Sequence, residues 1–155
     1  MAAAHELLSQ RGWSGVGLEA IARNQLAPYA AAANVAVSGP EVTLTPAAIQ
    51  AMGMVLHELV TNAIKYGALS VPTGRVTVSW DLNATAHATN LVLAWRELGG
   101  PAVVGEAKSG YGTRLIRGLV PHELGGTVDL EFAAEGVNCR IEFPLSSELQ
   151  RNNPR

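Results

Sequence analysis

The sequence has little cysteine, little excess charge and no long apolar run, and each shortage excludes a class of protein. Cys139 is the only cysteine among 155 residues, which rules out an internal disulfide and a cysteine-based metal cluster. The formal net charge of -2 offers no electrostatic footprint for nucleic acid. No stretch of about 18 apolar residues could span a membrane, and the first residues lack the basic and apolar parts of a signal peptide. We therefore expect a cytoplasmic protein.

Signatures of several common sites are also missing. The four histidines show no zinc spacing. No Gly-Lys-Ser/Thr ending marks a Walker P-loop, and no six-residue glycine pattern after a first strand marks a Rossmann fingerprint. A nucleotide site in this chain would have to be of another kind.

What is present suits one globular domain with short extensions. Hydrophobic residues make up 48% of the chain and charged residues 15%, a balance typical of a folded core. A chain of this length buries roughly two thirds of its unfolded surface. We expect an N-terminal helical segment over residues 1–33, a main domain over 34–145 and a disordered tail over 146–155.

Apolar residues spaced by three and four predict helices over 2–11 and 17–33, the second with a possible kink at Pro28. A long helix is expected to begin at Thr45-Pro46, where a hydroxyl cap precedes a proline, and to end at Gly67 in a left-handed cap. A short helix is expected over 113–120.

Alternating apolar residues predict strands in the second half of the chain. They are expected over 75–82 and 91–97, joined by a polar connection, and in a closing hairpin of 127–132 and 137–143. Valines 35 and 37 with Val42 and Leu44 favour one further short strand pair. This order predicts an α+β fold, a two-layer α/β sandwich in which helices cover one face of a mixed or antiparallel sheet.

The long helix carries an unusual polar stripe. Glu58, Asn62 and Lys65 lie at positions i, i+4 and i+7, beside the apolar face of the helix. Asparagine is a poor helix former, and its amide oxygen can coordinate magnesium. A lysine can neutralise phosphate, and a carboxylate can orient a water or a reacting hydroxyl. Taken alone, such a stripe is more often ordinary solvated surface.

Two glycine-containing segments follow. Glu97 ends a strand and precedes Gly99-Gly100, so a carboxylate that can accept a hydrogen bond from adenine stands beside a backbone that permits close approach. Gly110-Tyr111-Gly112 opens the short helix, whose free N–H groups can hold phosphate. Each segment alone is a common structural turn.

In this order, the segments resemble the HWE subfamily of histidine kinases, within the GHKL superfamily of ATP-binding domains that share the Bergerat fold. The resemblance runs from about His5 to Leu145. Three motifs carry it: His57-Glu58-Leu59-x-x-Asn62-Ala63-x-Lys65-Tyr66-Gly67-Ala68-Leu69-Ser70, Trp95-x-Glu97-x-Gly99-Gly100-Pro101, and Gly110-Tyr111-Gly112-Thr113-x-Leu115-Ile116. It implies that residues 34–145 form an ATP-binding catalytic domain.

The resemblance also implies roles for these residues. Asn62 would bind the Mg2+ that bridges the ATP phosphates, Lys65 would contact phosphate, and Glu58 would be the neighbouring general-base or polar carboxylate. Glu97 stands where other GHKL proteins have an aspartate that recognises adenine, and residues 100–110 would form a short ATP lid. The full set implied to bind ATP is His57, Asn62, Lys65, Tyr66, Glu97, Gly99, Gly100, Gly110, Tyr111, Gly112, Thr113 and Leu115.

The implied activity is transfer of the ATP γ-phosphate to a histidine on a separate dimerisation and phosphoacceptor domain, followed by relay to a response regulator. Two departures stand out. Val137 follows Gly136 where many GHKL kinases have a threonine, and residues 1–33 look like a remnant following the helices that carry the phosphoacceptor histidine. Two alternatives stay open: a protein serine kinase of the anti-sigma-factor type, and a degenerate domain that only binds nucleotide or a partner.

Overall fold

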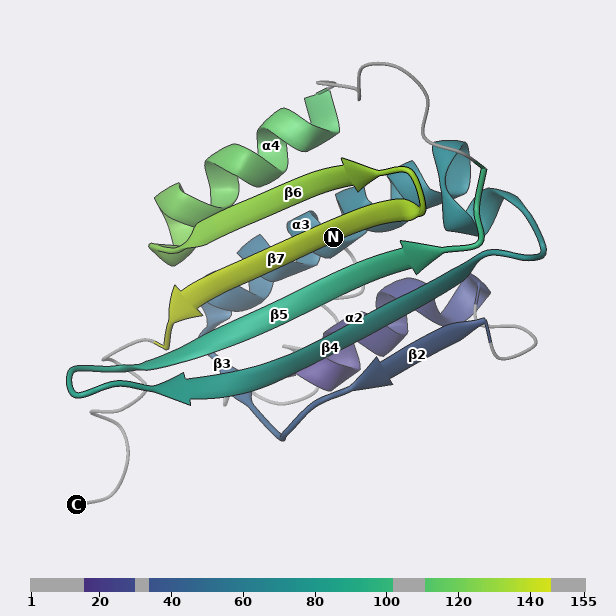
Figure 1. The fold of residues 1–155 in the computed structure, drawn as a ribbon. Coiled ribbons are helices and arrows are strands. Elements are labelled where there is room, and N and C mark those ends of the chain that lie inside the picture. The colour runs from purple at the N-terminus through teal and green to yellow at the C-terminus, as the bar shows by residue number, and fades with distance from the viewer. Residues whose placement is uncertain (1–15, 30–33, 102–110, 146–155) are drawn as a thin grey trace.

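A computed structural model describes residues 16–29, 34–101 and 111–145 of the chain. They form two layers, a five-stranded sheet and a set of helices on one of its faces (Figure 1). The elements in chain order are β1 (Val16–Gly17), α2 (Leu18–Leu26), the 3-10 turn η1 (Ala27–Tyr29), β2 (Val35–Ser38), β3 (Thr43–Leu44), α3 (Pro46–Tyr66), the 3-10 turn η3 (Ala68–Ser70), β4 (Arg75–Ala84), β5 (Thr89–Leu98), α4 (Tyr111–Leu119), the π-helical turn η4 (Val120–Leu124), β6 (Thr127–Ala133) and β7 (Gly136–Pro144).

The sheet is mixed, in the order β2-β4-β5-β7-β6. β2 pairs parallel with β4, and the other neighbours pair antiparallel. The register places Val78, Trp95 and Cys139 side by side on three adjacent strands. The expected α+β sandwich with a mixed sheet is therefore confirmed, as is the closing hairpin of β6 and β7.

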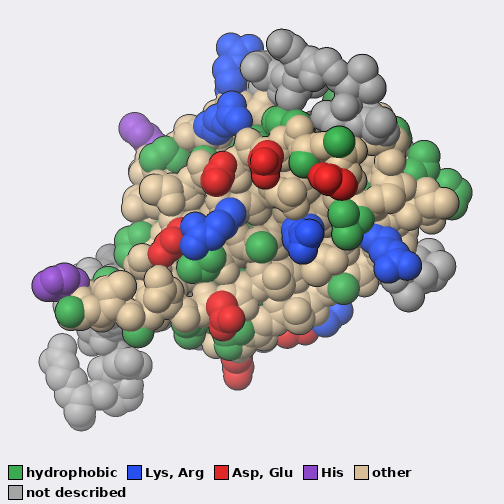
Figure 2. Space-filling model, in the orientation of Figure 1, with side chains coloured by type: hydrophobic (Ala, Val, Ile, Leu, Met, Phe, Trp, Pro, Cys, Tyr) green, Lys and Arg blue, Asp and Glu red, His purple; other side chains and the backbone are tan. Residues whose placement is uncertain are grey.

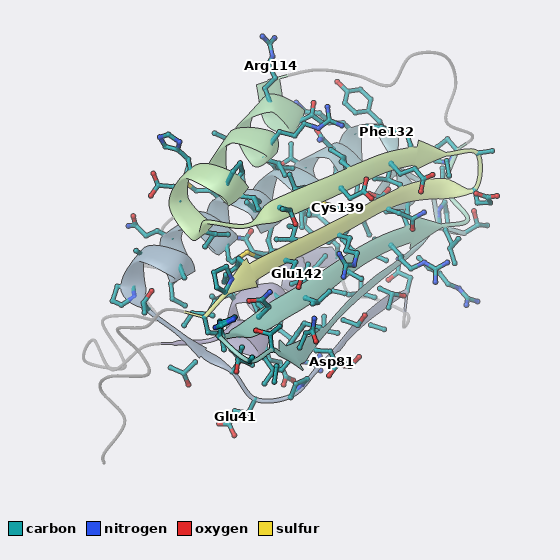
Figure 3. All side chains as sticks on the ribbon, turned by 60° about the vertical axis from the view of Figure 1, so that its left-hand side comes forward. Glu41, Asp81, Arg114, Phe132, Cys139 and Glu142 are labelled. Atoms are coloured by element: carbon teal, nitrogen blue, oxygen red, sulfur yellow. The ribbon has the colours of Figure 1, made fainter. Side chains whose placement is uncertain are left out.

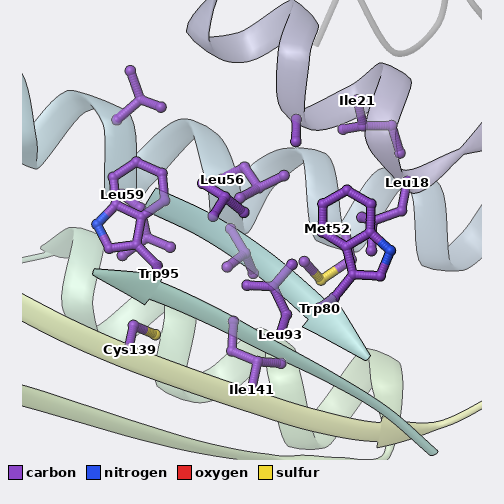
Figure 4. Packing of buried hydrophobic residues seen from close by; sticks show 14 of the residues in the cluster. Leu18, Ile21, Met52, Leu56, Leu59, Trp80, Leu93, Trp95, Cys139 and Ile141 are labelled. Atoms are coloured by element: carbon purple, nitrogen blue, oxygen red, sulfur yellow. The ribbon is translucent and has the colours of Figure 1, made fainter. Parts of the chain in front are cut away.

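The core lies between the sheet and α3. Apolar positions that alternate along β4, β5 and β7 face the helix layer, and α3 lays its apolar side over them (Figure 4). Burying one leucine or isoleucine side chain stabilises a fold by roughly 1.5–3 kcal/mol. The largest fully buried side chains are Leu18, Ile21, Leu26, Leu44, Ile49, Met52, Leu56, Leu91, Leu93, Trp95, Ile116 and Ile141.

The opposite face of the sheet is polar. Charged side chains of both signs spread over it (Figure 2), and Arg140 contacts Glu142 at 3.2 Å. Within the described residues, helices cover only the other face, as the alternation of apolar and polar residues along the strands requires. None of the described helices is long and apolar enough to cross a membrane.

The long helix begins as its sequence predicts. The Thr45 hydroxyl accepts a hydrogen bond from the Ala48 N–H at 3.3 Å, and Pro46 occupies the first turn. Its end differs from the prediction: Gly67 has φ -120° and ψ -147°, so it is not a left-handed cap. A different constraint requires glycine there, because an added Cβ would lie 2.2 Å from Oε1 of Glu97.

The prediction that residues 35–44 form a strand pair is wrong. β2 pairs with β4, and β3 pairs instead with β1 in a separate two-stranded sheet. The strands of the hairpin between β4 and β5 are longer than expected, because Thr85 Oγ1 closes a tight turn by accepting hydrogen bonds from the N–H groups of His87 and Ala88. Alternation of apolar residues predicts a strand, but it does not tell whether that strand pairs with the next strand in the chain or with a distant one.

The two shorter helices also depart from their predicted ends. α2 stops at Leu26, and the chain continues as a 3-10 turn that contains Pro28, whose missing N–H cannot continue an α-helix. α4 continues into π-helical η4, which contains Pro121 and ends at left-handed Gly125 (φ 68°). The helix predicted over 2–11 and the tail predicted over 146–155 lie outside the described residues.

Candidate functional site

The carboxylate of Glu97 lies at the centre of the candidate site. Alternation along β5 turns it to the same face as Trp95, under the C-terminal end of α3, where it is 3% exposed. Its Oε1 accepts a hydrogen bond from the Ala68 N–H at 3.0 Å, and its Oε2 accepts one from the Trp95 indole N–H at 2.9 Å. Burial raises the pKa of Glu97, and these two hydrogen bonds act against that shift.

Glycines allow the backbone to pack closely around this carboxylate. A Cβ on Gly100 would lie 2.8 Å from Cα of Ala68, and one on Gly136 would lie 1.9 Å from the carbonyl oxygen of Glu97. Gly99 has φ 74°, and its missing Cβ leaves room for the carbonyl of Thr73. The glycines of the second motif thus have structural reasons to be there. Approach of a nucleotide base to Gly99 stays a prediction.

The polar stripe of α3 runs towards this carboxylate. Glu58 and Asn62 are half-buried at the border of the helix's apolar face, and Lys65 is exposed. Within residues 16–29, 34–101 and 111–145, these three side chains make no hydrogen bond or ion pair with one another or with other side chains. A half-buried amide without a partner among the described residues is available to a ligand.

The third motif lies at the start of α4, which packs against α3. Thr113 is buried at 3% exposure and is engaged in an interaction within the protein, Leu115 is half-buried, and Arg114 projects outwards (Figure 3). Tyr111 and Gly112 form the first turn of the helix, and Gly110 lies outside the described residues. In Figure 1 the end of β5 and the first turn of α4 lie towards the same end of the sheet.

Four described residues of the predicted set are exposed: His57, Lys65, Tyr66 and Gly99. His57 is exposed on α3, and Tyr66, the last residue of that helix, is 66% exposed. We take as the candidate site Glu58, Asn62 and Lys65 on α3, Glu97 on β5 and the start of α4, with Tyr66 at its border. Whether each residue touches ATP stays a prediction.

Sequence reasoning missed the contacts that hold Glu97 in place. The Ala68 N–H and the Trp95 indole both donate to it, and the Thr73 hydroxyl donates to the Gly99 carbonyl at 2.8 Å. One signal was available: residues two apart on a strand face the same way, so Trp95 and Glu97 had to be neighbours. The Ala68 contact, 29 residues away in the chain, had no local signal.

The donor set fits a magnesium ion shared with a phosphate ligand. Mg2+ prefers oxygen ligands and is usually held through one or two protein oxygens, several waters and substrate phosphates. The half-buried amide of Asn62 and the carboxylate of Glu58 one turn earlier are oxygen donors of this kind. Among the described residues no cluster of three or more His, Cys, Asp or Glu could hold a metal alone.

Comparison with solved structures defines the class of fold. The histidine kinase domain of a blue-light-activated kinase from Erythrobacter litoralis superimposes with a TM-score of 0.69 at 17% identity, covering 95% of this chain and 72% of that one. The catalytic domain of histidine kinase ThkA superimposes with a TM-score of 0.60 at 16% identity, covering 85% of this chain and 96% of that one. The fold is that of a histidine kinase catalytic domain.

Sequence comparison finds similarity to the same class of kinases. The model of the HWE histidine kinase family matches residues 1–41. A blue-light-activated histidine kinase of Rhizobium johnstonii is 35% identical over 93% of this chain, and one of Erythrobacter litoralis is 37% identical over 94%. These matches confirm the resemblance to HWE histidine kinases. The chain spans 41% of the length of each of these two relatives.

Proposed function

We propose that this chain is the ATP-binding catalytic domain of a two-component histidine kinase. In this proposal it transfers the γ-phosphate of ATP to a histidine on a separate helical domain, from which the phosphate passes to an aspartate of a response regulator. ATP and Mg2+ are its expected ligands, and the cytoplasm is its expected location. ThkA, whose fold is similar, has been solved in complex with the response regulator TrrA.

One hydrogen bond carries this proposal. The Ala68 N–H, just beyond the end of α3, donates to Oε1 of Glu97 at the end of β5, 3.0 Å away. This hydrogen bond joins α3, which carries Asn62 and Lys65, to β5, which carries Glu97, the candidate for recognising adenine. A phosphate-binding stripe and a carboxylate on adjoining elements suit one molecule that has both a triphosphate and an adenine.

The chemistry assigned to this chain is positioning and charge neutralisation, since phosphoryl transfer asks little covalent chemistry of the enzyme. The amide oxygen of Asn62 would hold Mg2+, which when bound neutralises charge that develops on the phosphates. Lys65 would place an ammonium group against phosphate, and Glu58 would orient or accept a proton. Glu97 would accept a hydrogen bond from the adenine amine.

Two other functions use parts of the same geometry. A serine kinase of the anti-sigma-factor type would form acid-stable phosphoserine on a partner. A degenerate scaffold would bind no nucleotide, or bind it without transfer. The pair Trp95 and Glu97, shared with the HWE resemblance, supports the histidine kinase over the serine kinase, and a nucleotide titration separates the kinases from the scaffold.

The test is a titration with Mg-ATP followed by a transfer assay. The chain is incubated with labelled ATP, alone and with the phosphoacceptor domain of a related HWE kinase. We expect binding of Mg-ATP, no label on this chain, and acid-labile, base-stable label on the added domain. Acid-stable label would support the serine kinase. Absence of nucleotide binding would overturn every kinase function.

A further inference from the structure

We propose that Trp95 is a positioning residue for nucleotide selection: its indole N–H sets the Glu97 carboxylate to accept a hydrogen bond from the 6-amino group of adenine. This inference rests on the proposed function and adds a residue to it.

The geometry fixes both oxygens of the carboxylate. Trp95 and Glu97 occupy alternate positions of β5 and face the same side, so that the indole Nε1 lies 2.9 Å from Oε2. The Ala68 N–H holds the other oxygen at 3.0 Å. Glutamate has one more side-chain torsion than aspartate, so it needs a second contact to hold its carboxylate still. Among the described residues, Trp95 supplies the only side chain that hydrogen-bonds to Glu97.

Trp95 and Glu97 together can bind only a ligand group that donates a hydrogen bond. An ionised carboxylate has about four acceptor sites and no donor, and an indole N–H only donates. Trp95 and Ala68 occupy two of these sites. The remaining sites can take only another donor, such as the exocyclic amine of adenine. A base that lacks this amine leaves an acceptor unpaired.

Burial raises the free-energy cost of leaving an acceptor of Glu97 unpaired. Trp95 is 0% exposed and Glu97 is 3% exposed. A buried polar group without a partner costs more than an exposed one, and sites built to hydrogen-bond a ligand group reject analogues that lack it. Held by the indole, the carboxylate cannot turn away to avoid a mismatched base.

The surrounding backbone leaves Glu97 little room to move. An added Cβ on Gly67 would lie 2.2 Å from Oε1, and one on Gly136 would lie 1.9 Å from the Glu97 carbonyl oxygen. The main chain therefore encloses Glu97 from two elements. Removing the indole N–H would free one oxygen of the carboxylate while leaving this enclosure in place.

The experiment compares two tryptophans. Trp80 is also a buried tryptophan in the sheet, and its indole donates a hydrogen bond of 2.8 Å to the Pro40 carbonyl (Figure 4 shows both rings). Trp95→Phe and Trp80→Phe each remove one such donor. The dissociation constants of Mg-ATP and of purine riboside triphosphate, which lacks only the 6-amino group, are measured for wild type and both variants.

We expect wild type to prefer ATP. Trp95→Phe should reduce the ATP preference roughly tenfold, the effect of about one hydrogen bond, while affinity for the analogue changes less than about twofold. Trp80→Phe should keep the wild-type preference. An unchanged preference in folded Trp95→Phe, or an equal loss in Trp80→Phe, would overturn the proposal. Wild type that binds both nucleotides equally would overturn it while leaving ATP binding intact; wild type that binds neither would refute the proposed function itself.

Two further measurements guard against a variant that does not fold. Site-specific replacement of Trp95 by 3-benzothienylalanine keeps the ring shape and removes only the N–H, and the same loss of preference is expected. In a Glu97→Ala background, which removes the acceptor, Trp95→Phe should cause no additional loss of ATP preference, because the two residues act through one contact. Independent, additive losses would show that Trp95 does not act through Glu97.

Discussion

Gly67 and Glu97 are in direct contact: an ideal Cβ on Gly67 would lie 2.2 Å from Oε1 of Glu97. The last turn of α3 can therefore approach the end of β5 only with glycine at this position. The contact places the carboxylate against the N–H of Ala68, the residue that follows the C-cap Gly67. Helix, strand and acidic side chain meet at one point of the fold.

Gly67→Ala should destabilise the protein by about 1–3 kcal/mol, because moving the buried carboxylate breaks its hydrogen bonds to Ala68 and Trp95. Gly118→Ala is the matched control. It lies inside α4 with nothing within 4 Å of the added Cβ, and should stabilise by about 0.4–1 kcal/mol. Urea denaturation of both variants measures these changes. A Gly67→Ala protein as stable as wild type would show that the carboxylate is not held in place.

Asn62→Ala should abolish magnesium-dependent ATP binding and leave the thermal midpoint no lower than that of wild type. Alanine is the better helix former, and the described structure gives the Asn62 side chain no internal hydrogen bond to lose. Asn24→Ala, at an exposed position of α2, makes the same chemical change away from the site. Calorimetric titration with and without Mg2+ measures the effect. Unchanged affinity in Asn62→Ala would remove this residue from its role.

The contribution of Glu97 to the stability of the fold should decrease as pH rises above about 4.5, in the window where Glu97 ionises. Burial raises the pKa of Glu97 above its value of 4.5, so the folded state holds a proton that the unfolded state has released. Because the folded state holds more protons at this site, the part of the free energy of unfolding that Glu97 contributes falls with increasing pH.

Glu97→Gln cannot ionise and should lose this part of the pH dependence. Urea denaturation of wild type and variant at several pH values from 4 upwards isolates the contribution of this residue, since every other titrating group is shared. Parallel curves for the two proteins would contradict a raised pKa at Glu97.

Cys139 should resist alkylation in the folded protein. It is 1% exposed, and burial first, then the charge of Asp129, raises the pKa of its thiol to about 12. Little thiolate exists near pH 8, and the reagent cannot reach it. Labelling with iodoacetamide, followed by mass spectrometry, should show modification only in the urea-unfolded chain. Rapid labelling under native conditions would show that the core opens at β7.

Much of the fold could be predicted from local patterns. Thr45 and Pro46 marked the start of α3, and alternation in 75–82 and 91–97 marked β4 and β5. The pairing of β2 with β4 could not be predicted, because residues 35–38 lie about 40 positions from their partners and a period of two fits any neighbour. The structure of Gly67 was predicted wrongly for the same reason: its constraint comes from Glu97, 30 residues later.

The sequence by itself determined which residues are available for chemistry: the stripe of Glu58, Asn62 and Lys65 follows from helical spacing alone. Only the tertiary structure decided what holds Glu97, because its partner Ala68 is brought to it by packing of α3 on the sheet. Local patterns set which face of an element a side chain occupies. Which faces meet is decided by burial of the whole core, to which residues from distant parts of the chain contribute.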